Sequence, residues 1–573
     1  MVAILGIGPS LLRNAHTDEA GFLYLAGQVL DGQRHGADFF EINPPLAIWL
    51  SIPPVLVHRG FDWSAWMAWV VMVVAITIAA LVLVARMLRL IEPSASHRRG
   101  FILAAGCAAL LLPRLEFSER EHLALVLVLP FVMLAAVRVV RAQVNRTDAL
   151  MAGLLAGIGF SLKPHFLLTW VLLELWLLGR LGRASLRRPE LWCLVVVGAT
   201  YLALVLLLAP EYLSMIVQLA PHYQAYLHNS LGAVVLLAGP TLLFIAWFSL
   251  ALRAVARDDD PLRDALSLAF VGFFVAAILQ QKGLNYHYLA AEGAGFLLLA
   301  RAWQTRPPRL TWYPSGIIVR LGFALVVLIP FLKTRGATRD LFARSRLQPG
   351  LDSSYPELLA TVKELAAGEA ILVLSSNMND GWPLTLDAGS RWASRYMHLW
   401  PMAASYHDVI LARPQGVVRA RPYPARTEFE RRFSDELIAD LERYQPRLLV
   451  VVLPDSTEIY GGHARRFDYL EYFGSDPRFR EILGRYREVS RIGIYKVLLR
   501  FSTVSGLSGD GADPEAARAT ARTDKPNRKG RGRTPVRRSF SVRKTRNRKL
   551  LSARGGTGRC FNSRRAMSGL RLR

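Results

Sequence analysis

Long apolar runs separated by short polar segments fill roughly the first 335 residues of the chain, and mostly polar sequence fills the rest. A helix needs about 20 apolar residues to cross a hydrocarbon core of about 30 Å. The clearest runs cover 64–86, 122–137, 190–209, 231–252, 264–281 and 315–332, and shorter ones cover 100–113 and 286–300. Counted with the two regions described next, the pattern predicts an α-helical polytopic membrane protein with about eleven transmembrane helices in residues 1–335.

Two parts of this region differ from simple spans. The stretch 149–180 is apolar except for Lys163-Pro164-His165 at its centre. Proline and charge at the midpoint predict a hairpin of two short helices. Residues 1–12 are apolar but too short to span, and they lack the basic start of a signal peptide. We interpret them as the end of a first helix that a wrongly assigned start codon has truncated.

The distribution of Arg and Lys between the loops predicts the orientation of the helices. Seventeen Arg lie in one alternating set of loops, at 86–99, 138–148, 180–190, 253–264 and 301–310. Only seven Lys and Arg lie in the other set, at 13–63, 113–122, 163–165, 210–230 and 280–287. Because positively charged loops stay in the cytoplasm, the first set is predicted to be cytoplasmic. The polar sequence after residue 335 is then predicted to lie outside the cytoplasm.

Residues 340–500 alternate helix-like and strand-like patterns. Helical spacing covers Tyr355–Ala367 and Glu428–Tyr444, and short apolar runs at Ala370–Leu374, Leu448–Leu453 and Ile492–Leu499 are typical of buried strands. This alternation predicts a C-terminal extracytoplasmic α/β domain.

The net charge of +26 comes largely from the C-terminal tail. Residues 501–573 carry 20 of the 70 Lys and Arg but only 4 of the 44 Asp and Glu. This Arg-rich sequence without an apolar pattern predicts a disordered basic tail, and its abrupt start fits a frameshift or read-through product. Compact nucleic-acid-binding folds carry such charge on a folded face, so we expect no nucleic-acid partner. Three cysteines exclude a disulfide framework and an all-Cys zinc site.

Residues with chemically useful side chains gather in the loops predicted to lie outside. They are Asp18 and Glu19; Arg114, Glu119, Arg120, Glu121 and His122; Lys163 and His165; and Lys282, Tyr286 and His287. A carboxylate can act as a general base, and Lys, Arg and His can stabilise a phosphate leaving group. Taken singly, each is more often a solvated surface residue, and Asp18 can instead cap the helix that follows it.

Several of these residues belong to short patterns. An acidic pair, Asp18-Glu19, follows the first apolar segment, and Pro44-Pro45-Leu46 precedes Trp49 and Leu50. A second acidic loop and a Lys282-Gly283…Tyr286-His287 element come later in the chain. In order and predicted sidedness, residues 13–500 resemble the GT-C superfamily of polytopic glycosyltransferases, which includes mannosyltransferases and aminoarabinose transferases that use polyprenyl-phosphate-linked sugars. Asn43 stands where some members carry a basic residue, which leaves that phosphate contact unassigned.

The resemblance implies an enzyme of the plasma (inner) membrane that transfers a hexosyl or pentosyl group from a polyprenyl-phosphate-sugar donor, with inversion. The acceptor would be a lipid, glycan or protein of the cell envelope. Asp18 is our choice of base, with Glu119 or Glu121 as partner, because it follows a helix end and should lie at the membrane surface. Glu19 would lie about 100° away from it around a helix, so both can hardly face one cavity. The cations of the outer loops, together with Tyr286, would hold the donor phosphate. Some relatives hold a divalent cation and others need none, so no cofactor is certain.

Two other functions compete with this hypothesis. A transporter or flippase of lipid-linked sugars should place binding residues near the bilayer midplane and show repeated halves. A non-catalytic envelope or assembly protein would carry its function in the outer domain. The hypotheses differ in whether Asp18 and the cationic residues come together at one site.

Overall fold

The structure is a computed structural model, and it describes residues 15 and 17–501. Within that range 62, 240–241, 248, 250–258, 306–352, 408, 410–415, 455–457 and 461–462 are not described. The chain divides into two units, Met1–Thr503 and Val504–Arg573, and all described residues belong to the first. The predicted helix end at 1–12, the span at 315–332 and the basic tail lie outside the described residues.

Five apolar helical segments are long enough to cross a membrane, counted within the described residues. They are α5 (Ala65–Ile91), α7 (Arg120–Val139), Pro164–Arg187, α10 (Pro189–Leu208) and α14 (Pro261–Leu279). The predicted runs at 64–86, 122–137, 190–209 and 264–281 are therefore confirmed as helices. This composition indicates a multi-pass membrane protein.

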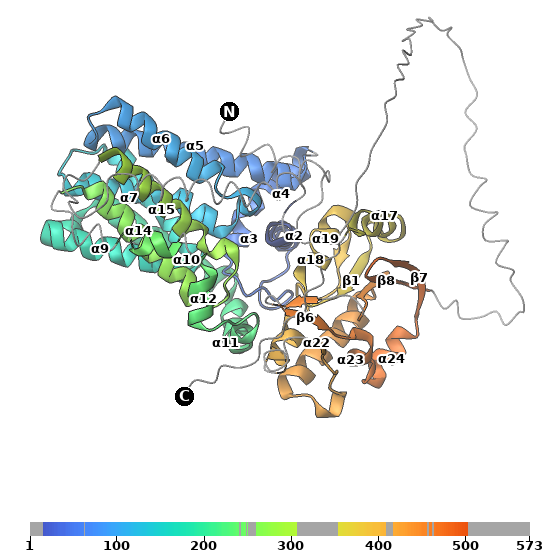
Figure 1. Cartoon of the computed structure of the whole chain (residues 1–573). Helices are drawn as coiled ribbons and strands as arrows, with labels where there is room; N and C mark the ends of the chain where they lie inside the picture. Colours follow the sequence, from blue (N-terminus) through green and yellow to red (C-terminus); the bar gives the residue numbers. More distant parts are fainter. Residues whose placement is uncertain are drawn as a thin grey trace, which may run out of the picture. The chain divides into compact units, whose positions relative to one another are not determined.

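Helix α7 forms the centre of the helical region, since 89% of its most apolar stretch is buried. The surrounding helices include α6 (Ala95–Leu110), α8 (Arg146–Ser161), α9 (Leu167–Leu181) and α15 (Leu289–Thr305), as Figure 1 shows. Gly293 lets α15 approach α7 closely, because a Cβ at this position would lie 2.1 Å from Leu125 Cδ2. In contrast, only 17% of the apolar stretch of α10 is buried, as expected of a helix that faces lipid.

The break predicted in the stretch 149–180 is confirmed. Helix α8 ends at Ser161, and the short helix η2 (Pro164–Phe166) follows Lys163 and leads into α9 and then η3 (Gly182–Arg187). The predicted span at 231–252 begins as α12 (Leu231–Leu237), but its second half is only partly described.

Short elements lie between the long helices, in the loops predicted to be outside. They are α2 (Thr17–Leu30), α3 (Leu46–Leu50), α4 (Ile52–Phe61), η1 (Arg114–Glu116), α11 (Pro210–Ala225) and η4 (Asn285–Tyr288). These elements, with the first turn of α7 and the α8–η2 junction, carry the residues singled out from the sequence.

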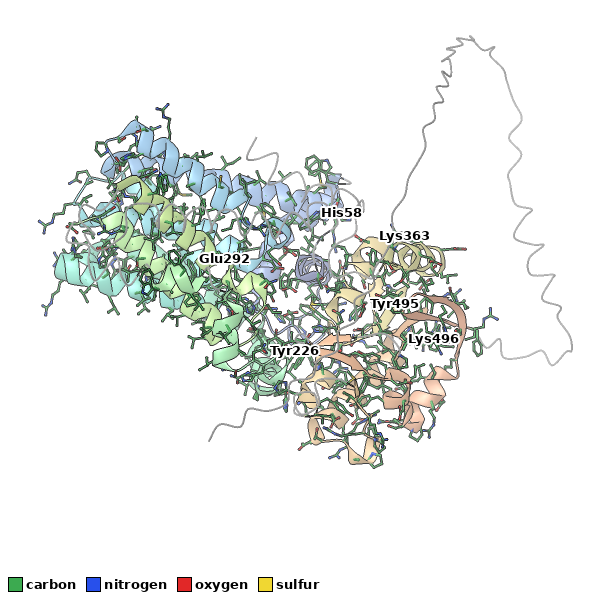
Figure 2. The ribbon with its side chains drawn as sticks, in the orientation of Figure 1. His58, Tyr226, Glu292, Lys363, Tyr495 and Lys496 are labelled. Carbon is green, nitrogen blue, oxygen red and sulfur yellow. The ribbon has the colours of Figure 1, made fainter. Side chains whose placement is uncertain are left out.

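A mixed five-stranded sheet organises the C-terminal region. Its order is β2 (Arg391–Trp392), β1 (Ala370–Leu374), β4 (Leu448–Val452), β8 (Tyr495–Arg500) and β7 (Tyr486–Ile492). The first three strands are parallel and the last two pair antiparallel. A separate three-stranded sheet has the order β3 (Gly416–Val417), β6 (His463–Arg466) and β5 (Glu458–Tyr460). Figure 2 shows the side chain of Tyr495 within the larger sheet, where it is buried.

Helices complete this region: α17 (Tyr355–Ala366), α18 (Met378–Gly381), α19 (Leu384–Ala388), α20 (Trp400–Ser405), η5 (Tyr423–Ala425), α22 (Glu428–Tyr444), α23 (Tyr469–Gly474) and α24 (Pro477–Leu483). The predicted helix over Glu428–Tyr444 is confirmed, and a capping box of Thr427 and Glu430 fixes its start. The predicted strand Ile492–Leu499 is wrong at its start. Ile492 ends β7, and Gly493, with φ +53°, makes the turn into β8, so one apolar run contains parts of two strands.

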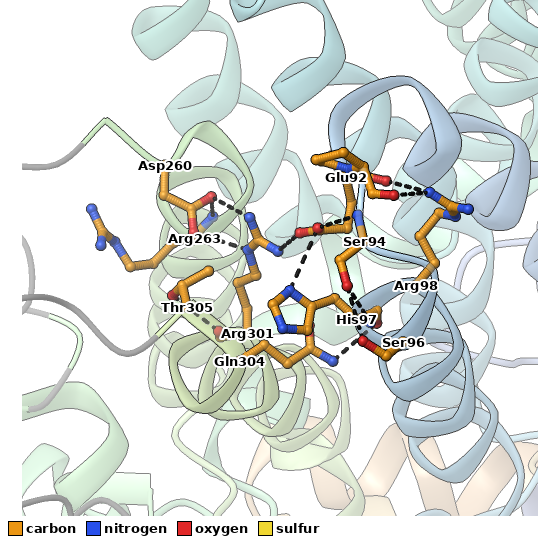
Figure 3. Close-up of polar contacts among 11 residues, drawn as sticks. Glu92, Ser94, Ser96, His97, Arg98, Asp260, Arg263, Arg301, Gln304 and Thr305 are labelled. Carbon is orange, nitrogen blue, oxygen red and sulfur yellow. Dashed lines mark hydrogen bonds and ion pairs between the residues drawn. The ribbon is translucent and has the colours of Figure 1, made fainter.

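A buried ion-pair network joins the ends of three helices (Figure 3). Arg301 of α15 donates from Nε to Asp260 at 2.9 Å and from Nη1 to Glu92 at 2.5 Å. Asp260 is the N-cap of α14, and Glu92 is the C-cap of α5. Within the described residues, none of these three side chains leaves a buried polar atom without a partner. We call this set the Arg301 clamp.

Candidate functional site

The first turn of α2 meets the first turn of α7 through one ion pair. Asp18 Oδ2 accepts a hydrogen bond from Arg120 Nη2 at 2.6 Å. The side chain of Arg120 is 5% exposed and that of Asp18 is 18% exposed. The guanidinium also lies 5.0 Å from the centre of the Phe22 ring, one turn further along α2. Asp18 is thus inside α2 rather than capping it, and its carboxylate is directed to α7.

Most of the hydrogen-bonding capacity of Arg120 is unused. Its Nε and Nη1 atoms are buried and have no hydrogen-bond partner among the described residues. A buried donor without an acceptor costs about 1–3 kcal/mol. Because a guanidinium presents its N–H groups as a planar fork, it suits the paired oxygens of a carboxylate or phosphate. Arg120 therefore has the unmet donors of an anion-binding group.

A second buried ion pair lies one residue further along α7. Glu121 Oε1 accepts a hydrogen bond from Lys163 Nζ at 2.6 Å. Lys163 also donates to Gln280 Oε1 at 3.1 Å, and its Nζ lies 5.5 Å from the centre of the Tyr286 ring. Burial lowers the pKa of Lys163, and the neighbouring Glu121 opposes that shift. Lys163, at the tip of the α8–α9 hairpin, thus joins the first turn of α7 to the segment that follows α14.

Glu19 and His122 bind the loop that leads into α7. Ser118 donates from Oγ to Glu19 Oε1 at 2.9 Å and from its backbone N–H to His122 Nδ1 at 3.0 Å. Since Nδ1 accepts, His122 Nε2 is the donor to the Ala109 carbonyl at 2.7 Å. Nδ1 of His122 thus contacts the loop and Nε2 contacts the end of α6, so both ring nitrogens are already hydrogen-bonded. Asp18 and Glu19 were expected to point in different directions around their helix. Their partners, Arg120 and Ser118, are nevertheless only two positions apart in the sequence.

Lys282 is occupied at the end of α11. Its Nζ donates to the carbonyls of Tyr223 at 2.8 Å, Gln224 at 3.3 Å and Tyr226. The ammonium also lies 4.7 Å from the centre of the Tyr223 ring. Burial lowers the pKa of Lys282 to about 8. Lys282 therefore caps α11 and positions its aromatic residues, and its contact with a donor phosphate stays a prediction.

The remaining predicted residues lie around these pairs. Tyr286 touches Lys163 through its ring, and His287 is 5% exposed with an Nδ1 that has no partner among the described residues. His165 is near enough to Lys163 and Glu121 for their charges to act on it. Arg114, in η1, instead interacts with the negative charge of Glu292 on α15. Glu119 is 1% exposed and lines the cavity described below.

Glu41 was given no role from the sequence, yet it also belongs to this cluster. Glu41 is 8% exposed, and its Oε1 accepts from the backbone of Asn43 at 2.8 Å and from the Asn43 amide at 2.6 Å. Burial raises its pKa, and the charges of Arg120 and Asp18 also act on it. Asn43, which the resemblance left unassigned, therefore holds a carboxyl group beside the Asp18–Arg120 pair. The only available signal was the position of Glu41 just before the Pro44-Pro45 pair.

A small cavity lies beside Arg120 and has room for about one water molecule. Glu19, Glu119 and Arg120 form part of its polar lining, while Phe22, Leu50, Trp69 and Leu123 give it apolar walls.

No set of three or more His, Cys, Asp and Glu residues is placed to hold a metal ion within the part of the chain that the structure describes. The divalent cation remains a prediction. A comparison with models of known protein families finds no match, and no curated protein matches the chain significantly.

Proposed function

We propose that this chain is a membrane glycosyltransferase that transfers a sugar from a polyprenyl-phosphate-linked donor to an envelope acceptor. One observation carries the proposal. The buried Arg120 guanidinium pairs with the partly exposed Asp18 carboxylate, and two of its nitrogen donors have no acceptor among the described residues. A phosphate has the charge and the oxygens to accept from them.

The cluster contains one candidate general base, Asp18, and two cations, Arg120 and Lys163. Asp18 is held by one oxygen, and its partial exposure lets an incoming hydroxyl reach it, so it is the candidate general base. Arg120 and Lys163 neutralise the phosphate as the bond to the anomeric carbon breaks. Glu19, His122 and Lys282 act indirectly, since each is hydrogen-bonded to the segments that carry the site.

The location of these residues favours an enzyme over a transporter or flippase. Asp18 lies in the first turn of α2, Arg120 is the first residue of α7, and Lys163 lies between α8 and η2. A transporter is expected to bind its substrate near the bilayer midplane, at breaks in long helices. A cluster at the ends of helices is expected instead at the membrane surface, where the phosphate of a lipid would lie.

The membrane arrangement that belongs to this proposal has about eleven helices, with residues 340–500 outside the cytoplasm of the plasma (inner) membrane. It rests on the asymmetry of Arg and Lys between the loops. Reporter fusions at residues 95 and 400 should report opposite sides of the membrane. The same side for both would contradict the arrangement and the roles assigned to the outer loops.

Sugar transfer in membranes tests the function directly. Membranes that contain the full chain should transfer radiolabelled sugar from defined polyprenyl-phosphate donors to a lipid or glycan product, and membranes without it should not. Asp18→Asn should lose this transfer while Asp31→Asn, an exposed carboxylate at the other end of α2, should retain it. Transfer that is equal with and without the protein, across the donors tested, would contradict the proposal.

A further inference from the structure

The turn between α9 and α10 joins the two least buried of the five apolar segments that are long enough to cross a membrane. Only 22% of the apolar stretch of Pro164–Arg187 and 17% of that of α10 are buried within the protein. Apolar side chains that a membrane-spanning helix leaves unburied face the lipid. The turn consists of η3 and Arg188. Its side chains therefore lie where the chain leaves the hydrocarbon and meets the lipid headgroups.

This turn lies at the opposite end of the helical region from the Asp18–Arg120 pair. Arg120 begins α7, and Arg138 in the last turn of α7 donates from Nε and Nη2 to the two carboxylate oxygens of Glu190, at 2.9 and 2.8 Å. Glu190 belongs to the first turn of α10, directly after the turn from α9. From Arg120 to Arg138 a helix rises about 27 Å, close to the thickness of a hydrocarbon core. The turn is therefore expected at the membrane surface opposite to the candidate site.

Two of the four arginines in and beside this turn are already paired with carboxylates. Arg180 Nη2 lies 2.5 Å from Asp259 Oδ1. Arg188 is 6% exposed, and it donates from Nε to the Ser185 carbonyl at 2.6 Å and from Nη2 to Glu174. These contacts fix the backbone of η3 from within the protein and leave the other two arginines to the outside.

The other two arginines are Arg183 and Arg187, which are exposed and make no hydrogen bond or ion pair with any of the described residues. Two apolar side chains of the same turn are also exposed, Leu186 by 51% and Trp192 by 59%. The Trp192 indole donates from Nε1 to the Leu186 carbonyl at 3.0 Å, which holds its ring against η3. A tryptophan at the end of a membrane-spanning helix is typical of the headgroup region. We call these four residues the η3 surface.

We infer that the η3 surface binds the headgroup of an anionic phospholipid. The two unpaired guanidinium groups donate to the phosphate oxygens, while Leu186 and Trp192 pack against the glycerol and the first carbons of the acyl chains. A zwitterionic lipid carries its own cation beside the phosphate, so the surface selects lipids with a net negative charge. A lipid fits better than a free phosphate, because the flanking helices face hydrocarbon and half of the exposed side chains are apolar. In a membrane, the bulk phospholipid occupies this surface by mass action.

The test measures lipid binding to the full chain in detergent by native mass spectrometry. The probes are phosphatidylglycerol and phosphatidylcholine with identical acyl chains. We expect the wild type to prefer phosphatidylglycerol by about tenfold or more, and the double variant Arg183→Gln/Arg187→Gln to bind the two lipids within about twofold of each other. The matched control is Arg141→Gln/Arg146→Gln, which removes two equally exposed arginines at the turn between α7 and α8 and should keep the preference. Trp192→Ala should weaken both lipids and leave the preference unchanged.

Three results would overturn the inference. The wild type binds both lipids equally, the two double variants lose the preference to the same extent, or inorganic phosphate in tenfold excess displaces the bound lipid. Thermal unfolding checks that the variants are folded, and the single variants Arg183→Gln and Arg187→Gln, each with a smaller loss of preference, replace a double variant that is not. Arg120→Gln should keep the preference for phosphatidylglycerol, because Arg120 lies at the other end of α7. A loss in that variant would place the lipid at Arg120 instead of at the η3 surface.

Discussion

Arg120 and Arg301 are both buried, both charged and both paired with carboxylates, yet they differ in what remains to be satisfied. Arg301 donates from Nε, Nη1 and Nη2 to Asp260 and Glu92, and it joins the ends of three helices. Arg120 donates from Nη2 alone, and its Nε and Nη1 atoms have no partner among the described residues. A satisfied guanidinium indicates a structural role, whereas an unsatisfied one indicates a place for a ligand. Burial of charge alone therefore does not distinguish a structural arginine from one that binds a ligand.

The largest effect should come from Asp18. Asp18→Asn removes the candidate base and should lower turnover by about 10²–10⁴, while the amount of folded protein stays normal. Steady-state transfer rates at saturating donor measure this loss. Glu19→Gln should cost much less, since Glu19 supports Ser118. If Asp18→Asn has normal turnover and Glu19→Gln is inactive, the general base is Glu19 instead of Asp18. If both variants are active, neither carboxylate is the base.

The Arg301 clamp should control stability instead of turnover. Arg301→Gln leaves Glu92 and Asp260 buried without their cation, a loss of about 3–5 kcal/mol. Thermal unfolding in detergent, followed by Trp fluorescence, measures it, and the transfer rate per folded molecule should not change. Arg86→Gln is the matched control, because Arg86 pairs with Asp148 while 57% exposed and should cost at most about 1 kcal/mol. Equal stability of the two variants would show that the clamp is not structural.

Arg120→Gln sharpens the same contrast. Because buried donors of Arg120 have no acceptor within the described part of the chain, removing Arg120 relieves part of the cost that its burial imposes. We expect a smaller loss of stability than in Arg301→Gln, measured in the same unfolding experiment. The reverse order would mean that Arg120 is the structural residue of the two.

The contact between α11 and the C-terminal region should weaken in acid. His398 lies 3.3 Å from the Tyr226 hydroxyl (labelled in Figure 2), and burial lowers the pKa of His398 to about 3. The unfolded chain therefore binds more protons between pH 6.5 and about 3, so stability falls as the pH falls through that range. The slope for one such histidine approaches about 1.4 kcal/mol per pH unit. His398→Asn should flatten the dependence, with exposed His58→Asn as control, and an unchanged slope would contradict the assignment.

The smallest effect should come from Ser118→Ala. The variant removes the hydroxyl that donates to Glu19, while the backbone bond from residue 118 to His122 remains. A lost hydrogen bond of this kind costs about 1 kcal/mol. Thermal unfolding should show this loss, with turnover within about threefold of the wild type, because the Asp18–Arg120 pair is untouched. A loss of turnover as large as that of Asp18→Asn would place the loop itself in the chemistry.

The sequence predicts best where local chemistry decides the structure. Lys163-Pro164 ends a helix because proline lacks an N–H and a charge cannot lie in hydrocarbon, and the capping box at Thr427 fixes the start of α22 in the same local way. The sequence also led to Asp18, Arg120 and Lys163, which the structure brings close to one another through Glu121 and the start of α7. Their chemical roles stay predictions.

Pairings between distant residues could not be predicted in this way. Arg301 and Glu92 are 209 residues apart, and no periodic pattern indicates that three helix ends meet. Lys282 looked like a phosphate ligand because its type and loop fit, but three backbone carbonyls use its donors. Glu41 was not chosen as a site residue, since a polar residue in a polar loop is not distinguished from its neighbours until its burial is known.

Binding of a polyprenyl phosphate to the protein in nanodiscs tests the central claim most directly. The comparison uses undecaprenyl phosphate and undecaprenol, which share the hydrocarbon chain and differ in the phosphate. We predict that the wild type prefers the phosphate at least tenfold, that Arg120→Gln abolishes this preference, and that Asp18→Asn retains it. An Arg120→Gln variant that binds the phosphate as tightly as the wild type would contradict the account.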